Sequence, residues 1–326
     1  MYNIAVIGSG QIGTRHLQGL ALSAEPMQIF VCDPSVNGLA EARNKWNEVA
    51  QENGKKNVVF SENYSGLPER LDVCIIATTS LHRKKTIEEI LITTKIRFLI
   101  LEKVLFPSVS DYGKTALLMR NNNVKAFVNC ARREFGFYRE LRDKFSRDSK
   151  IHFTVFGNNF GLGCNGIHFL DLFVYLTGCS DLIMLTPGLD KKIKESKRKG
   201  FKEITGTLTG FDACGNTFSI SSFEGNPSPV KIIVSSSDRY YYIEEGVEGK
   251  FLVSEAGSGW SSVNGLFPVP KISELTGNIV DDLLHAGTCR LTTYDESARI
   301  HIPFISAVKD HMEKCLEIQL DYCPVT

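Results

Sequence analysis

Apolar runs and helical stretches alternate through the first 130 residues. Each short strand-like run is followed by a segment in which apolar residues recur with helical spacing. This alternation predicts a parallel sheet wound on both faces by helices. The expected strands are Ile4–Ile7, Gln28–Cys32, Val58–Phe60, Val73–Ala77, Phe98–Leu101 and Lys125–Val128, and the expected helices are Ile12–Leu22, Gly38–Asn53, Lys84–Thr93 and Val109–Asn121.

The pattern changes after residue 131. A connecting helix over Arg132–Asp148, a strand over Ile151–Phe156 and a helix over His168–Leu176 are followed by runs of alternating polarity. Consecutive strands without helices between them indicate an open, mostly antiparallel sheet. We therefore predict an α/β domain at 1–130 and an α+β domain at 131–326. The expected strands of the second domain are Thr205–Phe211, Thr217–Phe223, Val230–Ser235, Tyr240–Glu244 and Phe251–Ser254, and Ile272–Ala286 and Glu296–Cys315 are its expected last helices.

Bulk composition narrows the class of partner. The 326 residues carry 37 basic and 37 acidic side chains, a balance that argues against nucleic acid or an anionic membrane surface. No apolar run approaches the roughly 18 residues of a membrane span, and Met1 leads directly into the first strand without a basic leader. The nine cysteines include no C-x-x-C pair, so we expect reduced thiols in a cytoplasmic protein and no metal site.

A basic segment, Asp190–Lys202, contains seven Lys or Arg residues. A phosphate-binding patch and a solvated loop between strands both fit this composition. We favour the loop, because the single aromatic residue Phe201 does not interleave the basic side chains in the manner of a nucleic-acid site and no second basic patch is present.

The segment Gly8-Ser9-Gly10-Gln11-Ile12-Gly13 joins the first strand to the first helix. In this context Gly8 permits a tight turn, Gly10 lets the backbone approach a pyrophosphate, and Gly13 lets the helix pack on the strand. Gln11 and Ile12 open the helix, whose free N–H groups and positive dipole end attract phosphate. The pattern predicts a dinucleotide-binding Rossmann domain, although a glycine-rich turn that has lost its ligand would look the same.

Asp33 ends the second strand, 20 residues after Gly13 (33 − 13). A carboxylate at this place binds the hydroxyls of the adenosine ribose and repels a 2′-phosphate. The sequence therefore favours NAD over NADP. Ser35 and Arg15 lie nearby in the sequence and would soften that preference.

Three further segments make the pattern more specific. Ile75-Ile76-Ala77-Thr78-Thr79-Ser80-Leu81-His82 follows the fourth strand, Leu101-Glu102-Lys103 follows the fifth, and Gly163-Cys164-Asn165-Gly166-Ile167-His168-Phe169-Leu170-Asp171 lies in the second domain. Together, and over essentially the whole chain, they resemble the glucose–fructose oxidoreductase / inositol dehydrogenase / MocA family. Members of that family mostly oxidise or reduce a secondary hydroxyl of a sugar, cyclitol or nucleotide-sugar with a nicotinamide cofactor.

The resemblance implies roles for individual residues. Thr78, Ser80 and His82 would lie beside the nicotinamide half of the cofactor, and Glu102 would approach the nicotinamide ribose. Lys103 and His168 would meet the reacting hydroxyl, with Cys164 and Asn165 near the substrate. The resemblance also implies a homodimer or homotetramer paired through the far face of the second-domain sheet.

The chain departs from the family pattern at three places. The segment from Ala77 to His82 is one residue shorter, and Val104 replaces the proline expected after Lys103. Cys164 stands where an aspartate is expected, four residues before His168, and Asn165 is one position out of register.

The residue types at the expected active site suit hydride transfer. Histidine titrates near neutrality, so His168 can accept the hydroxyl proton in one direction and return it in the other. The Lys103 ammonium would stabilise the developing alkoxide. A neutral thiol at Cys164 cannot offset that charge as an aspartate would, which keeps open a second hypothesis: a catalytically inactive, dinucleotide-binding regulatory protein on the same scaffold.

Overall fold

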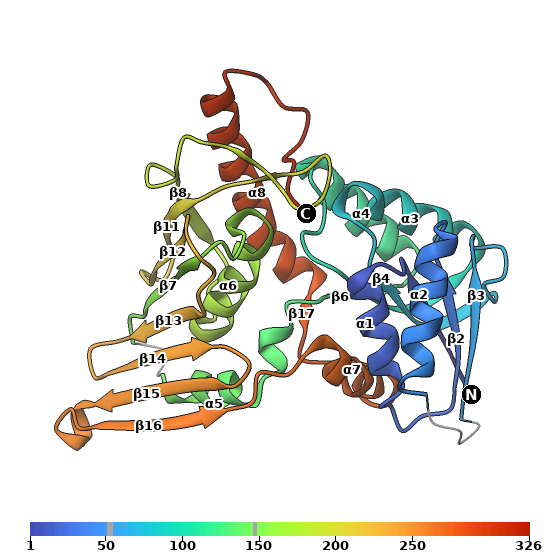
Figure 1. Cartoon of the computed structure of the whole chain (residues 1–326), viewed down its shortest axis with the longest axis horizontal. Helices are drawn as coiled ribbons and strands as arrows, with labels where there is room; N and C mark the ends of the chain where they lie inside the picture. Colours follow the sequence, from blue (N-terminus) through green and yellow to red (C-terminus); the bar gives the residue numbers. More distant parts are fainter. Residues whose placement is uncertain (51–54, 146–148) are drawn as a thin grey trace. The chain divides into compact units, whose positions relative to one another are not determined.

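The computed structural model describes residues 1–50, 55–145 and 149–326, which divide into two compact units (Figure 1). The first unit comprises Met1–Phe106, Ser110–Ala131 and Pro270–Asp295, and the second comprises Pro107–Val109, Arg132–Val269 and Glu296–Thr326. The expected contiguous division at 130 and 131 differs from this, because residues 270–295 return to the first unit.

Within the described residues, the first unit holds a seven-stranded sheet in the order β17-β6-β5-β4-β1-β2-β3. Its six main strands pair in parallel, and β17 joins the edge in the antiparallel sense. The strand order reverses at β1, which is the doubly wound arrangement that the alternating pattern predicted. The bounds are β1 Tyr2–Ile7, β2 Met27–Cys32, β3 Lys56–Ser61, β4 Arg70–Ile76, β5 Lys95–Leu101, β6 Lys125–Val128 and β17 Thr292–Thr293.

The helices of this unit bury their apolar faces on the sheet. Helix α1 (Gln11–Leu20) contacts β1 and β4, α2 (Val36–Asn47) contacts β3, and α3 (Ser80–Thr93) contacts β4. Helix α4 (Val109–Asn121) has the predicted bounds. Helix α2 ends before the predicted Asn53, because the exposed Val49 gives no further apolar contact after the buried Trp46; residues 51–54 lie outside the described residues.

Helix α7 (Ile272–Ala286), predicted as a helix of the second half, packs on α1 instead. Two glycines allow the close approach. A Cβ on Gly19 would lie 2.8 Å from the Cβ of Thr276, and a Cβ on Gly277 would lie 2.8 Å from the Gly19 carbonyl oxygen. Sequence periodicity identifies such a helix but not the partner on which it packs.

The second unit holds, within the described ranges, an eight-stranded sheet in the order β16-β15-β14-β13-β7-β12-β11-β8. Only β7 and β12 pair in parallel; all the other neighbours are antiparallel. The predicted fold class is confirmed in both units. The bounds are β7 His152–Asn158, β8 Leu182–Leu185, β11 Gly206–Asp212, β12 Thr217–Phe223, β13 Val230–Ser235, β14 Arg239–Glu245, β15 Gly249–Glu255 and β16 Ser262–Phe267, with β9 Lys194–Glu195 and β10 Lys202–Glu203 forming a separate two-stranded sheet.

One face of the large sheet is covered by helix α6 (Leu162–Thr177), and no helix in the described part of the chain covers the other. On the covered face, Phe173 packs against Phe153 and Phe218 with ring centroids 5.9 Å and 5.2 Å away. On the uncovered face, Thr154 lies in register with Ser219 and Ile233. Helix packing on this sheet, as far as the described residues show, is therefore confined to one face, where Phe137 also stacks on Phe267.

The observed bounds of two helices of the second unit differ from the predicted ones, and those of a third agree. Helix α6 begins at Leu162 rather than at the predicted His168. Gly163 and Gly166 have no apolar side chains, so the helical periodicity is not visible in the sequence of its first turns, although these positions are buried. The predicted helix over Arg132–Asp148 is a 3₁₀ turn (Ala131–Glu134) followed by α5 (Gly136–Lys144), and residues 146–148 lie outside the described residues. Helix α8 (Tyr294–Leu316) follows the prediction closely.

The strands that were not predicted lack a regular alternation of apolar and polar residues. Strand β16 is exposed at four of its six positions, β8 is exposed at two of its four, and β9, β10 and β17 have two residues each. In the part of the chain that the structure describes, no helix combines the length and apolar character required to cross a bilayer.

Candidate functional site

The glycine-rich loop between β1 and α1 holds its three glycines for different reasons. Gly8 adopts φ +95°, and a Cβ on Gly13 would lie only 1.7 Å from the Gly8 carbonyl oxygen. A Cβ on Gly10, by contrast, would meet no atom of the described residues within 4 Å. Gly8 and Gly13 are therefore required by the chain itself, whereas the space over Gly10 is open to an external group.

The N-terminus of α1 opens onto the same space. Gly10 is the N-cap and provides no side chain, and Gln11 and Ile12 form the first turn. The first N–H groups of a helix have no partner within the helix, and the dipole places partial positive charge there. With no acid in this turn, the terminus is suited to an anionic ligand such as a phosphate.

Asp33 lies half-buried at the end of β2 and is held by the loop. Its Oδ2 accepts the Ser9 N–H at 2.6 Å, and its Oδ1 accepts the Ser35 N–H at 2.8 Å. Each carboxylate oxygen keeps a further lone pair. The carboxylate is thus fixed in place with capacity for two hydroxyl donors.

A cavity of about 520 Å³ adjoins the loop. Ser9, Gly10 and Gln11 line one side of it, and Arg15 and Lys45 contribute cations. The buried Ser9 hydroxyl has no hydrogen-bond partner within the described ranges. Glu41 and Glu48 also line the cavity, and Glu48 pairs with Lys45 at 2.7 Å, so the lining is polar and of mixed charge and suits a polar ligand.

The loop between β4 and α3 differs along its length. The Thr78 hydroxyl is buried and has no hydrogen-bond partner among the described residues. Ser80 is fully buried, whereas His82 is exposed. The loop is pinned by Arg83, a buried residue that the sequence analysis did not select: its guanidinium donates to the carbonyls of Thr78, Val104 and Leu105. Arg83 therefore ties this loop to the segment that follows Lys103.

Glu102 is the centre of a buried polar network. Its Oε1 lies 3.0 Å from His16 Nε2 and also accepts a hydrogen bond from the Asn129 amide. His16 Nδ1 lies 2.9 Å from the Thr276 hydroxyl, which itself donates to the Ile272 carbonyl. The Thr276 hydroxyl proton is thus directed to Ile272, and its oxygen faces His16, which links Glu102 through His16 to α7.

This network sets the charge of Glu102. Burial alone would raise its pKa, but the His16 contact and the Asn129 hydrogen bond outweigh burial and hold the pKa below its usual value. The sequence analysis missed His16 and Thr276, because they come from α1 and α7, far from Glu102 in the chain. Lys103 follows directly, half-buried beyond the carboxyl end of β5.

The first two turns of α6 carry the predicted substrate residues of the second unit. Cys164, Asn165 and His168 are all half-buried, and Cys164 and His168 share one face of the helix through their i, i+4 spacing. The Asn165 N–H donates to the Gly161 carbonyl at 2.7 Å, and its side-chain amide donates to the Phe160 carbonyl at 2.5 Å. Asn165 therefore stabilises the turn that begins α6.

Glu203, which the sequence analysis did not select, lies against this turn. Its carboxylate accepts the Gly163 N–H and the Ile204 N–H at 2.9 Å, whereas the Cys164 thiol donates to the Gly161 carbonyl at 3.6 Å. Burial raises the pKa of Glu203 above its usual value although these donors oppose the shift. A carboxyl group is thus present beside Cys164, supplied by β10 rather than by α6.

The predicted site residues are shared between the units. The glycine loop, Asp33, Thr78, Glu102 and Lys103 belong to the first unit, whereas Cys164, Asn165 and His168 belong to the second. Convergence of Lys103 and His168 on one substrate stays a prediction.

Comparison with known proteins gives matches of structure. No family description and no curated protein sequence matches the chain. An oxidoreductase from Agrobacterium radiobacter, solved with NAD⁺, L-tartaric acid and magnesium, superposes with a TM-score of 0.73 at 15% identity, over 95% of this chain and 96% of that one. A 3-ketoreductase from Actinomadura kijaniata, solved with NADP and TDP-benzene, gives 0.70 at 14% identity over 95% and 97%.

A UDP-N-acetylglucosamine 3-dehydrogenase from Acidithiobacillus ferrooxidans gives a TM-score of 0.70 at 12% identity, over 94% of this chain and 96% of that chain. At these identities the likeness establishes the fold over nearly the whole length of each protein. It agrees with the fold that the sequence resemblance implied.

Proposed function

We propose that this protein is a nicotinamide-dependent oxidoreductase of the glucose–fructose oxidoreductase / inositol dehydrogenase / MocA type. It would transfer a hydride between NAD(P) and a secondary hydroxyl or ketone of a sugar, cyclitol or nucleotide-sugar. The observation that carries the proposal is the open space above Gly10 at an uncapped helix N-terminus, beside a fixed carboxylate at Asp33.

The residues of the first unit fit a dinucleotide. The N–H groups at Gln11–Gly13 would bind the pyrophosphate, and Asp33 would bind the adenosine ribose. The buried, unpartnered Thr78 hydroxyl gives a donor for the nicotinamide half. We propose NAD as the preferred form, because the Asp33 carboxylate would repel a 2′-phosphate; the solved relatives include both an NAD⁺ complex and an NADP complex.

The bound nicotinamide ring would supply the hydride chemistry, and the protein would supply geometry and proton transfer. In the oxidative direction, His168 accepts the hydroxyl proton while the Lys103 ammonium stabilises the alkoxide oxygen. In the reductive direction, protonated His168 returns the proton to the same oxygen. Glu102, held anionic by its contacts with His16 and Asn129, positions Lys103, its neighbour in the chain.

Glu203 lies beside Cys164, the position at which the family pattern has an aspartate. The Cys164 thiol cannot carry the charge of a carboxylate, but the Glu203 carboxyl contacts the same helix turn, where it accepts the Gly163 N–H. We propose that Glu203 takes over the electrostatic role of the absent aspartate, which keeps His168 basic enough to act near neutrality. This contact weighs against the inactive regulatory protein as the alternative.

We also propose that copies of the chain pair through the uncovered face of the large sheet. Phe211 lies in register with Ile183 on this face, and Leu185 and Tyr240 are likewise exposed there. An apolar face of this kind gains stability when it is paired. Light scattering should return a dimer or tetramer; a mass near 36.3 kDa at micromolar concentration would contradict pairing.

The test of function begins with the cofactor carried by the purified protein. The protein should release, or bind stoichiometrically, a nicotinamide dinucleotide, and its absorbance should change on addition of one sugar, cyclitol or nucleotide-sugar from a panel. Dinucleotide binding without turnover of any of these substrates would favour the regulatory alternative. Failure to bind either dinucleotide would overturn both.

A further inference from the structure

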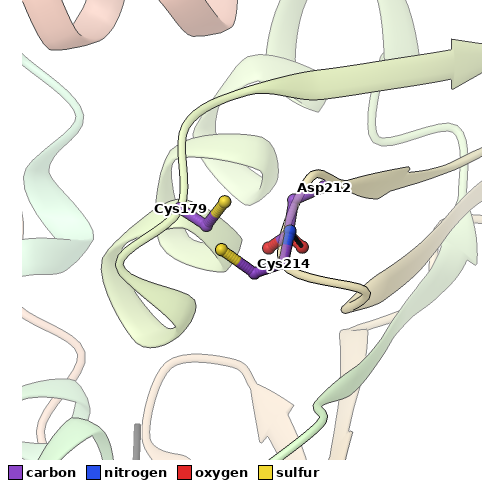
Figure 2. Close-up of side chains that lie close together, drawn as sticks. All are labelled: Cys179, Asp212 and Cys214. Carbon is purple, nitrogen blue, oxygen red and sulfur yellow. Dashed lines mark hydrogen bonds between the residues drawn. The ribbon is translucent and has the colours of Figure 1, made fainter. Parts of the chain in front are cut away.

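Two cysteines and an aspartate that are separated in the sequence meet in the second unit (Figure 2). Cys179 follows the C-terminal Gly178 of α6, and Asp212 and Cys214 belong to the turn between β11 and β12. Their ligand atoms all lie within 4.8 Å of one another. Figure 2 shows both sulfur atoms pointing into the space between the helix end and the turn.

The backbone holds the three groups in place. The Ala213 N–H donates to the Asp181 carbonyl at 3.0 Å, which ties the turn to the segment after α6. The Asp212 carboxylate accepts the N–H groups of Cys214 and Asn216, each at 2.9 Å, and the Asn216 amide at 2.7 Å. Hydrogen bonds of this kind orient a carboxylate ligand in metal sites.

We infer that Cys179, Asp212 and Cys214 form a binding site for a thiophilic divalent cation of the zinc class, with a water molecule as the fourth ligand. Zinc accepts two thiolates and a carboxylate in tetrahedral sites, and its bond lengths of about 2.3 Å to sulfur require sulfur atoms about 3.8 Å apart. All three ligand atoms lie within 4.8 Å of one another, a limit that includes the required sulfur–sulfur distance. The inference is independent of the proposed dinucleotide function.

The surroundings of the three residues give a metal ion access from solvent and place a positive charge nearby. Cys214 is exposed, which gives an entry path, whereas Cys179 is buried. The Lys150 ammonium donates to the Cys214 carbonyl and places a positive charge beside an otherwise anionic ligand set. Thiols ligate a metal as thiolates, so binding should release protons and strengthen as the pH rises.

A disulfide between Cys179 and Cys214 is the competing outcome. It would require an oxidant and a sulfur–sulfur distance of about 2.05 Å, and it would leave Asp212 with its hydrogen bonds in the turn but no part in joining the two cysteines. The carboxylate that faces both thiols favours the metal. In the cell the ion would join the end of α6, the helix that carries His168, to the β11–β12 turn.

The experiment is a titration of the reduced full-length protein with Co²⁺ under anaerobic conditions, followed by competition with Zn²⁺. We expect one equivalent to produce a thiolate-to-cobalt charge-transfer band, which Zn²⁺ abolishes. Cys179→Ser and Cys214→Ser should each remove the band, whereas Cys289→Ser, which alters a partly exposed thiol outside the cluster, should retain it. Asp212→Asn should weaken binding by at least the roughly tenfold that loss of an outer-shell partner costs.

Thiol mapping keeps the inference testable if a variant folds poorly. In the wild-type protein, Zn²⁺ should protect Cys179 and Cys214 together from alkylation, as identified by peptide mass spectrometry. Absence of the band in the wild type, its persistence in Cys214→Ser, or recovery of the two cysteines as a disulfide from protein purified with a thiol-blocking reagent would overturn the metal site.

Discussion

The N-termini of α1 and α6 are built alike and used differently. Each helix follows a glycine N-cap without a side-chain hydrogen bond, and each begins with glycine-rich backbone. At α1, a Cβ on Gly10 would meet nothing within 4 Å among the described residues, whereas at α6 a Cβ on Gly163 would lie 2.7 Å from Glu203 Oε1. The protein fills one positive helix end with its own carboxylate and leaves the other for a ligand.

This difference shows what decides the use of a helix N-terminus. Free N–H groups and the dipole exist at every helix start, so they do not by themselves identify a ligand site. What distinguishes α1 is the reserved space together with Asp33, which is fixed nearby. What distinguishes α6 is that a side chain from β10 completes it.

The largest expected effects fall on the groups that we propose carry out the chemistry. Lys103→Met and His168→Ala should each lower turnover by about 10²–10⁴-fold, because each removes a positioned proton-transfer or oxyanion-stabilising group. Dinucleotide affinity should change little in either variant. The measurement is steady-state turnover on the substrate found by screening.

Lys95→Met is the matched control, since Lys95 is exposed at the opposite end of β5 and should leave turnover unchanged. If Lys103→Met retained most of the wild-type rate, the assignment of the oxyanion-stabilising role would be wrong.

Two glycine substitutions distinguish a glycine that the fold needs from a glycine that dinucleotide binding needs. Gly13→Ala should destabilise the fold at or beyond the upper end of the roughly 1–3 kcal/mol typical of overpacking, because the new Cβ overlaps the Gly8 carbonyl oxygen. Gly10→Ala should fold normally yet weaken dinucleotide binding at least about tenfold, about 1.4 kcal/mol. Thermal unfolding and fluorescence titration with NADH measure the two effects.

Gly66→Ala serves as the reference here, because a Cβ at Gly66 also meets no atom within 4 Å in the described chain, at a position away from the loop. Unchanged dinucleotide affinity in Gly10→Ala would mean that the space over Gly10 is not where the ligand binds.

The choice between NAD and NADP tests Asp33. Asp33→Asn keeps an oxygen acceptor for the Ser9 N–H but removes the charge, so NADPH should gain affinity relative to NADH by roughly tenfold, which lies within the Coulomb energy of about 1–4 kcal/mol expected for two charges 4 Å apart near a protein surface. Parallel fluorescence titrations with the two reduced cofactors give the ratio. Equal or tighter binding of NADPH to the wild-type protein would contradict the proposed NAD preference.

The smallest expected effect is on the pH dependence of stability, which should differ between the buried carboxyls of Glu102 and Glu203. The pKa of Glu203 is raised by burial, so its contribution to stability is present below the unfolded pKa and is lost as the pH rises through the folded pKa. The pKa of Glu102 is lowered despite burial, so its contribution is present above the unfolded pKa and is lost as the pH falls through the folded pKa.

Urea unfolding across the acidic to neutral range should therefore give opposite trends. Relative to the wild type, Glu203→Gln should gain stability as the pH rises, whereas Glu102→Gln should lose it. Parallel trends for the two variants would mean that the two carboxyls do not differ in environment as described.

Local pattern predicted the parallel sheet, the glycine loop and the position of Asp33, because these depend on residues that are close together in the chain. Helix α7 was identified by its periodicity but assigned to the wrong half, since its packing against α1 depends on small residues at Gly19 and Gly277 that pattern does not pair. His16, Arg83 and Glu203 were missed for the same reason. Each acts on a segment that only folding brings near, so nothing local marks it.

The account rests on the open helix end at α1, and a calorimetric titration of the wild-type protein with NADH tests it most directly. It predicts one saturable site per chain, with ADP-ribose competing for it because that fragment carries the same pyrophosphate and adenosine ribose. Absence of saturable binding by NADH and by NADPH up to millimolar concentration would contradict the account.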